Sequence, residues 1–494
     1  MLWLSQPASW GPRASQRPEP GPGAGEPKRL LNIPASELRS CAVQPSALSL
    51  TRSPSPSSRK VQPPEGRLCL ATTGPAKVTE MPSLRKPWHS MAKALILGCL
   101  LTGFLLLFYA YLAPLQVNMA DPQDETSCSS PPTLPVNTTE GSCQPKMDIV
   151  FMKTHKTASS TLLNILFRFG QKHHLKFAFP SGYNDFNYPT FFKRSLVHNY
   201  QPGDCFNIIC NHMRFRYPEV RGLVAPNTTF ITVLRDPAHL FESSFHYFGM
   251  VVPFTWKLTG HNKLAKFLQN PTQYYNPQGY NAQFLHNLLF FDLGYNNELD
   301  PRSPQVEEHI LEVEQRFHLV MLQEYFDESL VLLKDLMCWE LEDILYFKLN
   351  ARRASAVPQL TGELYQRATE WNQLDALLYR HFNASFWRKV EAFGRERMAR
   401  EVANLRRENE RMRSICIDGG QAVDAEAIQE SSMQPWQPLG TKTILGYNLK
   451  KRINQRHKQL CRKMLTPEIQ YLIDLGVNLW VIRIFKYIRE FLRW

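Results

Sequence analysis

The sequence predicts an α/β fold with a central parallel sheet flanked by helices, behind a single N-terminal transmembrane helix. Short apolar runs alternate with helical patterns from residue 147 onward, which is typical of a parallel sheet covered on both faces. One long apolar run, residues 94–112, precedes this region and is long enough to cross a bilayer core. The mean hydropathy of −0.33 argues against a multi-pass membrane protein.

Residues 1–80 differ in composition from the rest of the chain and are predicted to be a disordered N-terminal extension. Proline clusters such as PEPGPGAG and SPSPSS recur here without an apolar period. Met81 is a second potential start, so we expect the mature protein to lack this extension. The alternative is a cytosolic tail with partners of its own.

The apolar run 94–112 is predicted to be a single-pass type II signal anchor. Basic residues precede it, and acidic residues follow it at Asp121, Asp124 and Glu125. This charge bias keeps the N-terminus in the cytosol. The expected order is therefore a cytosolic tail over 81–93, the anchor over 94–112, a lumenal stem over 113–146 and a lumenal catalytic domain over 147–494.

The lumenal side carries features of a secretory compartment. Its three N-x-[ST] sequons, at Asn137, Asn227 and Asn383, are candidate glycosylation sites. Seven cysteines follow the anchor, and disulfides are expected among them because the compartment is oxidising. The odd number leaves at least one cysteine free or in an intermolecular bond, and the pairing cannot be deduced from sequence.

Apolar patterning places the expected elements of the lumenal domain. Buried strands are predicted at 147–152, 206–210, 230–234 and 318–322, and a helix at 159–173. Residues 383–415 are predicted to form one long charged helix. The C-terminal segment 466–494 has apolar residues at helical spacing with interspersed arginine and lysine. It is either a helix docked on the core or an interfacial helix near a membrane.

The first motif that carries chemistry follows the strand at 147–152 and opens the next helix. A helix N-terminus offers free N–H groups to a phosphate or sulfate, Lys156 adds a cation, and the hydroxyl groups add donors. The loop resembles a P-loop without its glycines. The alternative is a Ser/Thr helix cap beside a solvated lysine. The candidate binding residues are Lys153, Thr154, His155, Lys156, Thr157, Ala158, Ser159, Ser160 and Thr161.

The second motif is Arg235-Asp236-Pro237, at the end of the strand 230–234. Pro237 suits the first turn of a following helix, and Ser243 lies two turns along it. An arginine fork with a nearby hydroxyl can hold a phosphate monoester. The alternative is an Arg–Asp turn followed by ordinary helix serines.

Together the two motifs resemble the cofactor-binding elements of carbohydrate sulfotransferases, which use 3′-phosphoadenosine 5′-phosphosulfate as sulfate donor. The resemblance implies that Lys156 to Ser160 hold the 5′-phosphosulfate and that Arg235 and Ser243 hold the 3′-phosphate. The segments IVFMKTHKTASSTLLNILFRFGQKH, IICNHMRF and LGYNLKK further resemble the galactose-3-O-sulfotransferase family. A P-loop-like sulfotransferase fold is then expected for the lumenal domain.

That resemblance implies a Golgi enzyme that sulfates the 3-hydroxyl of a terminal β-galactose. The implied acceptors are galactosylceramide and lactosylceramide-type glycolipids, and the product of the first is sulfatide. The alternative is a galactose 3-O-sulfotransferase acting on protein-linked glycans. A nucleotide-binding kinase or a non-catalytic lumenal receptor stays open as another class, although the missing Walker glycines oppose the kinase.

Candidate roles follow from the chemistry of sulfuryl transfer. Lys156 suits the cation that stabilises the leaving phosphate. His212 follows the strand 206–210 in an H-x-R context similar to that of a base histidine in heparan sulfate 2-O-sulfotransferases, and His155 is the second candidate base. No metal is expected, because the sequence has no ligand cluster at zinc spacing.

The formal charge of +13 bears on partners. Nucleic acid is not expected, because the chain has neither zinc-ligand spacing nor a basic heptad region. The expected partners are a glycolipid acceptor and the Golgi membrane. A homodimer is a further candidate, and the sequence does not fix the oligomeric state.

Overall fold

The computed structural model describes residues 143–357, 359–440 and 442–492, together with residues 98, 102 and 103. The predicted extension 1–80, the cytosolic tail, most of the anchor and nearly all of the stem, including Asn137, lie outside the described residues. Within the described part of the chain, no helix has the length and apolar character needed to cross a membrane.

A five-stranded parallel sheet forms the centre of the region predicted to be the lumenal domain, which confirms the predicted α/β class. Its strand order is β2-β3-β1-β4-β5, and every neighbouring pair is parallel. The strands are β1 (Ile149–Met152), β2 (Phe177–Ala178), β3 (Ile208–Ile209), β4 (Thr229–Leu234) and β5 (Leu319–Leu322). Because β1 is central, its carboxyl end lies beside the carboxyl ends of β3 and β4.

Hydrophobic burial holds this sheet in place. All of β1, β4 and β5 are buried. Burying an aliphatic or aromatic side chain of this size contributes about 1.5–3 kcal/mol. The sequence missed only β2, because a two-residue strand has no measurable alternation.

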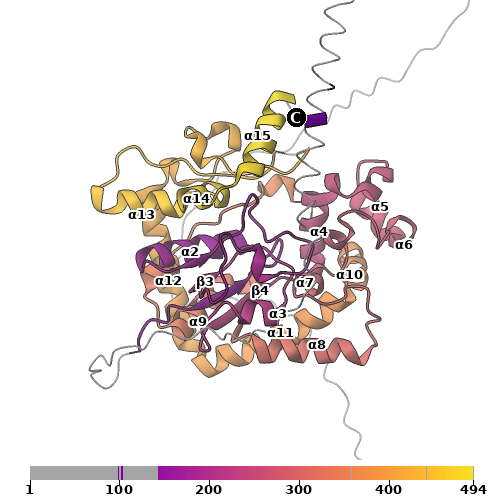
Figure 1. Cartoon of the computed structure of the whole chain (residues 1–494), viewed down its shortest axis with the longest axis horizontal. Coiled ribbons are helices and arrows are strands. Elements are labelled where there is room, and N and C mark those ends of the chain that lie inside the picture. Colours follow the sequence, from indigo (N-terminus) through magenta and orange to yellow (C-terminus); the bar gives the residue numbers. More distant parts are fainter. Residues whose placement is uncertain (1–97, 99–101, 104–142, 358, 441, 493–494) are drawn as a thin grey trace, which may run out of the picture. The chain divides into compact units, whose positions relative to one another are not determined.

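Helices cover the sheet on both sides (Figure 1). Helix α2 packs against α13 and α14, whereas α9 and α11 pack against β5. The helices are α2 (Ser159–Lys172), α3 (Tyr217–Arg221), α4 (Pro237–Phe248), α5 (Lys263–Gln269), α6 (Pro271–Tyr274), α7 (Leu288–Asp292), α8 (Pro304–Arg316), α9 (Phe326–Met337), α10 (Gly362–Trp371), α11 (Gln373–Phe393), α12 (Arg395–Cys416), α13 (Gln455–Leu465), α14 (Glu468–Asp474) and α15 (Trp480–Leu492).

Two long helices predicted from the sequence are interrupted by glycine. The helix expected at 383–415 is instead the end of α11 followed by α12, because Gly394 between them has φ 95°. The C-terminal segment is likewise split into α14 and α15, and Gly476 between them has φ 86°. Both angles lie in the region that glycine adopts most readily, so the chain turns there.

Disulfides join distant parts of this domain. Cys143 pairs with Cys338, which lies at the end of α9, and Cys416 pairs with Cys461 to connect α12 with α13. Cys210 is a buried free thiol next to β3. The oxidising compartment predicted from the sequence is consistent with both bonds.

Candidate active site

The loop between β1 and α2 has the geometry of an anion-binding loop without its glycines. Lys156 and Ala158 adopt left-handed backbone angles, with φ 58° and 61°. Ala158 is the N-cap of α2 and makes no side-chain cap, and the first turn of α2 has no acidic residue. The N–H groups at the start of this helix are therefore available to an anion. The alternative of a Ser/Thr cap does not describe this loop.

Most of the hydroxyl groups in the loop maintain its shape. Thr154 and Thr157 hydrogen-bond to each other at 2.9 Å, and Ser159 donates to the Thr154 carbonyl at 2.8 Å. The Thr161 hydroxyl accepts a hydrogen bond from the Leu349 amide at 3.2 Å. These hydroxyl groups are thus engaged within the protein. An anion in the loop would be bound mainly by backbone N–H groups.

Lys153 is a buried ion-pair partner. Its Nζ lies 2.8 Å from both carboxylate oxygens of Glu468, at the start of α14. The Ser160 hydroxyl also donates to Glu468, at 2.9 Å. Burial acts to raise the pKa of Glu468, but the Lys153 charge and the hydrogen bonds outweigh it and hold that pKa below its usual range. The C-terminal segment is therefore attached directly to the loop.

Lys156 points away from this ion pair, into a cluster of cations. Its Nζ lies 3.7 Å from the centre of the Tyr247 ring. Burial, followed by repulsion from Arg352 and Arg235, lowers the pKa of Lys156 to about 7. Glu242 offsets part of this charge, so the three cations leave a net positive position, as an anion site requires.

Arg235 comes directly after β4 and connects the two sequence motifs. Its Nη1 donates to the Lys156 carbonyl at 3.0 Å, while its buried Nε has no hydrogen-bond partner among the described residues. Asp236 caps α4 by accepting from the His239 amide, and Pro237 begins that helix, as predicted. Ser243 lies further along α4 and faces the same cavity.

Both motifs line one cavity of about 720 Å³. Arg352 lies there as well, in a bidentate ion pair with Glu242 of α4 at 2.9 and 2.5 Å. We call this space the donor cavity. It holds an unpaired buried arginine nitrogen, a lysine and a helix N-terminus, which fits a ligand with two separate phosphate groups.

His212 and His155 stack at the edge of the donor cavity. Their ring centres are 4.0 Å apart and the rings are nearly parallel, at 7°. The Nδ1 of His212 lies 2.9 Å from the Lys153 carbonyl, so Nδ1 carries the proton and Nε2 keeps its lone pair. Burial, then the neighbouring His155 and Lys153, lower the pKa of His212 well below its usual value.

His155 is held by a buried carboxylate. Its Nδ1 lies 3.0 Å from both oxygens of Asp292, and its backbone amide donates to the same side chain at 2.8 Å. The Tyr188 hydroxyl donates to Asp292 at 2.8 Å. These contacts fix the orientation of the His155 ring, and His155 stays the second candidate base, because a carboxylate at Nδ1 leaves Nε2 to accept a proton.

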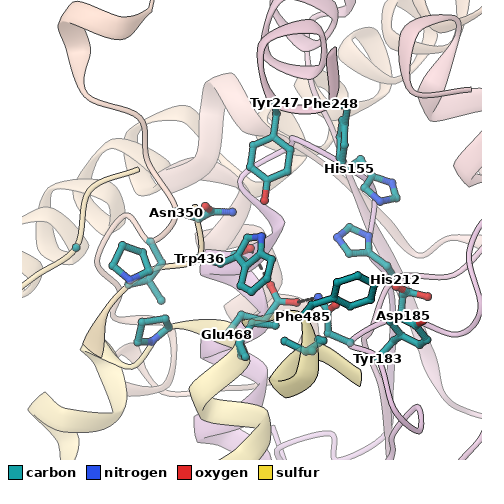
Figure 2. Close-up of a pocket in the computed structure, with 18 of the residues that line it drawn as sticks. His155, Tyr183, Asp185, His212, Tyr247, Phe248, Asn350, Trp436, Glu468 and Phe485 are labelled. Atoms are coloured by element: carbon teal, nitrogen blue, oxygen red, sulfur yellow. Dashed lines mark hydrogen bonds between the residues drawn. The ribbon is translucent and has the colours of Figure 1, made fainter. Parts of the chain in front are cut away.

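A second cavity, of about 420 Å³, meets the donor cavity at the two histidines. Figure 2 shows His212 and Glu468 facing this space, with Phe485 and Trp436 beside them. We call this space the acceptor cavity. The residues that line both cavities are His155, Ser160, Asn184, His212, Tyr247, Phe248, Leu349, Asn350 and Glu468.

Sequence reasoning missed the residues that support this junction. Tyr188, Asp292, Arg352 and Glu468 each lie outside the two motifs, and no local spacing singles them out. Tyr247 lies one helical turn after Ser243 on α4, and this spacing is the sequence feature that could have placed it on the same face as Ser243. The described residues contain no group of three His, Cys, Asp or Glu side chains that could hold a metal ion.

The two sequons within the described residues differ in their surroundings. Asn227 is exposed in the turn before β4, where a glycan has room. Asn383 is half-buried within α11, and its Oδ1 is buried without a hydrogen-bond partner in the described part of the chain. Glycosylation at Asn227 therefore has the better structural support.

Comparison with known proteins identifies the family. The galactose-3-O-sulfotransferase family model matches residues 80–479. The chain belongs to the galactose-3-O-sulfotransferase family. Galactosylceramide sulfotransferase from Bos taurus is 74% identical over 418 residues, which is 83% of this chain and 99% of the relative. The Homo sapiens protein of that name is 72% identical over 422 residues, which is 84% of this chain and 100% of the relative.

More distant members of the family match a shorter part of this galactose-3-O-sulfotransferase. Galactose-3-O-sulfotransferase 2 from Sus scrofa is 39% identical over 333 residues, which is 66% of this chain and 83% of the relative. The family match begins at residue 80, close to Met81. Residues 1–79 thus lie outside the matched region.

Proposed function

We propose that this enzyme transfers the sulfuryl group of 3′-phosphoadenosine 5′-phosphosulfate to the 3-hydroxyl of galactose in galactosylceramide, and so makes sulfatide. Lactosylceramide-type glycolipids are further acceptors. High identity to galactosylceramide sulfotransferases over nearly their whole length supports the acceptor. The observation that carries the chemistry is the junction, where the cation-rich donor cavity meets a second cavity at His212.

The sulfate donor spans the two motifs in this proposal. Its 5′-phosphosulfate lies on the backbone N–H groups of the loop and on Lys156, and its 3′-phosphate lies on Arg235 and Ser243. The unpaired Nε of Arg235 supports the second contact, because a phosphate oxygen would satisfy it. Lys156 gains a full charge when the anion binds, since a nearby phosphate raises a depressed lysine pKa.

Transfer is a single in-line displacement at sulfur. The 3-hydroxyl oxygen of galactose forms the new S–O bond while the bond between sulfur and the phosphate oxygen breaks. His212 Nε2 takes the hydroxyl proton, and the leaving 3′-phosphoadenosine 5′-phosphate keeps the electron pair. Lys156 stabilises the charge that develops on the leaving phosphate. The neutral state and free Nε2 of His212 support its role as the base.

The proposed setting is the Golgi membrane, with residues 94–112 as a type II anchor and the catalytic domain in the lumen. The two disulfides support an oxidising compartment. A homodimer stays a prediction.

A sulfation assay with the full chain tests the proposal. We expect transfer of labelled sulfate from 3′-phosphoadenosine 5′-phosphosulfate to galactosylceramide and lactosylceramide. Glucosylceramide is the matched control, because it differs only at the sugar. Competition with a Galβ1-4GlcNAc oligosaccharide addresses protein-linked glycans. Preference for the oligosaccharide, or transfer to glucosylceramide at the same rate, would contradict the proposed acceptor.

A further inference from the structure

Exposed apolar side chains lie at the acceptor cavity and along α15 beside it. We call this set the apolar rim and define it by Tyr183, Trp436, Trp480, Ile484, Phe485 and Tyr487. On α15 the exposed fractions are 45% for Trp480, 48% for Ile484, 57% for Phe485 and 71% for Tyr487. Large apolar side chains gathered on one surface commonly mark a site of interaction with a protein or a membrane.

The apolar rim is continuous with the cavity that contains His212. Tyr183, Trp436 and Phe485 line that cavity and are also 40% exposed or more. The loop before Tyr183 packs directly on α15, because a side chain at Gly182 would meet Val481 at 3.3 Å and Trp480 at 3.4 Å. Figure 2 shows Phe485 and Trp436 beside the same space as His212.

Helix α15 has one buried and one exposed face. Val481 is buried and Ile482 packs partly buried against the core, whereas Trp480 and Ile484 face outward. In the described residues of the segment before it, Leu472 is fully buried and Ile469 packs partly buried. The docked helix expected from the sequence thus applies to α14 and to the Val481 side of α15, whereas Trp480 and Ile484 of α15 stay exposed.

We propose that the apolar rim docks on the surface of a phospholipid bilayer that carries the acceptor. This inference rests on the proposed function, since galactosylceramide is itself a membrane lipid. Docking places the opening of the acceptor cavity at the bilayer surface. The galactose then reaches His212 while the two hydrocarbon chains of the ceramide stay in the membrane, so no lipid extraction is needed.

Charge and composition favour a bilayer over a second copy of the chain. Arg483 is exposed on α15, and the same segment of sequence contains Lys486, Arg489 and Arg493. Basic residues among Trp, Tyr and Phe suit the boundary between phospholipid headgroups and acyl chains. A second copy on the apolar rim would also cover the opening through which the acceptor must pass.

The test compares two acceptors and two matched variants of the full chain. The enzyme is reconstituted in vesicles of phosphatidylcholine that contain galactosylceramide, and methyl β-galactoside in solution is the second acceptor. Ile484→Glu changes the apolar rim without touching either cavity. Leu311→Glu is the control, because Leu311 is similarly exposed, at 43%, but lies on α8.

We expect Ile484→Glu to lower kcat/KM for galactosylceramide about tenfold or more, because a charged carboxylate replaces an apolar side chain on the face that enters the lipid interface. Its kcat/KM for methyl β-galactoside should stay within about twofold of the wild type, and Leu311→Glu should stay within about twofold on both acceptors. A surface substitution away from the core seldom unfolds a protein, and the soluble acceptor reports directly on folding.

Other outcomes overturn the inference in distinct ways. Equal losses on both acceptors, or no loss on either, would exclude docking on the bilayer. A dimer that Ile484→Glu dissociates, measured by light scattering, would assign the apolar rim to a second copy. A wild-type chain that sulfates methyl β-galactoside but not galactosylceramide would overturn the proposed acceptor, and the docking with it.

Discussion

The proton states of two side chains determine what the junction can do. His212 is neutral because burial and nearby cations disfavour its charged form, and its free Nε2 can accept a proton. Lys156 has a pKa of about 7, so the empty enzyme holds it only partly charged at neutral pH. In the proposed mechanism, His212 therefore accepts the proton of the galactose hydroxyl, and Lys156 becomes fully charged when the sulfate donor binds.

Replacing His212 separates turnover from binding. His212→Ala should lower kcat by ~10²–10⁴, the usual contribution of a positioned base, and leave the Kd for 3′-phosphoadenosine 5′-phosphate nearly unchanged. Lys156→Ala should impair both quantities, because the proposed role of Lys156 is to contact the phosphates before and during transfer. Single-turnover rates and calorimetric titration measure the two effects. His212→Ala with more than a tenth of wild-type turnover would move the role of base to another residue.

Donor binding should depend on pH through Lys156. Its pKa of about 7 means that the ammonium is present below this pH and is lost above it. The Kd for 3′-phosphoadenosine 5′-phosphate should therefore rise above pH 7 by up to about tenfold per unit, since phosphate charges are complete there. Lys156→Arg is the control, because its cation persists and its Kd should stay flat. A flat wild-type profile would contradict the assignment.

The guanidinium group of Arg235 should contribute to donor affinity by binding the 3′-phosphate. We expect Arg235→Ala to weaken binding of 3′-phosphoadenosine 5′-phosphate by about 2–4 kcal/mol, as for truncating one partner of a desolvated pair. Adenosine 5′-phosphosulfate lacks the 3′-phosphate, so its affinity should change much less. Equal losses for both ligands would mean that Arg235 acts only by holding the Lys156 carbonyl.

The sequence predicted the candidate site residues that belong to a local motif. It missed the residues that contact those motifs from distant positions in the chain. Lys156 and Arg235 were predictable because loop and strand-end positions meet at the carboxyl edge of a parallel sheet. Asp292 and Glu468 were not, because they lie 137 and 315 positions from their partners His155 and Lys153. Only tertiary packing brings such pairs together.

Among the elements, the short helix α14, of seven residues, connects the C-terminal segment to the loop between β1 and α2. Its first residue, Glu468, accepts hydrogen bonds from Lys153 and Ser160, which lie near the other end of the domain in sequence. The strands and the loop could be predicted from apolar runs, but the end of α11 and the start of α15 could not. The apolar period continues across Gly394 and Gly476, where the chain changes direction.

Breaking the Lys153–Glu468 pair should destabilise the fold. Glu468→Gln leaves the Lys153 charge buried and should lower the free energy of unfolding by ~3–5 kcal/mol. The pKa of Glu468 is depressed in the folded state, so this contribution is present at neutral pH and fades as acid protonates the carboxylate. Urea unfolding at several pH values measures both effects.

A solvent-exposed ion pair provides the control for that experiment. Asp335 pairs with Arg397 at 2.8 Å, and both side chains are about half exposed. Asp335→Asn should change the free energy of unfolding by at most about 1 kcal/mol. Similar losses for Asp335→Asn and Glu468→Gln would show that burial of the Lys153 pair has no special effect.

In the whole molecule, the boundary between the unmatched N-terminal residues and the region that matches the family lies near Met81. The family match runs over residues 80–479, and it includes the predicted anchor and the predicted lumenal domain as far as the residue before α15. The fold class and the family were accessible from the sequence because both motifs keep their order and spacing. The apolar rim was not, because helical spacing alone does not say which face of a helix stays uncovered.

Translation should begin at Met81 or Met91 in most of the native product, because residues 1–80 carry no folding or targeting signal. Mass spectrometry of the native N-terminus measures this directly. Abundant peptides from residues 1–80 would contradict it, and peptides from the lumenal domain serve as the control for coverage.

The meeting of the two cavities also has a consequence for the kinetic mechanism, that is, for whether both substrates bind before transfer. In the proposed arrangement the sulfate donor and the glycolipid occupy separate cavities that meet at His212, so both can be bound at once. Sulfur then passes directly between two oxygens in a ternary complex, without a sulfated enzyme. Initial-rate plots should therefore intersect rather than run parallel, and a sulfuryl group made chiral with oxygen isotopes should emerge with inverted configuration.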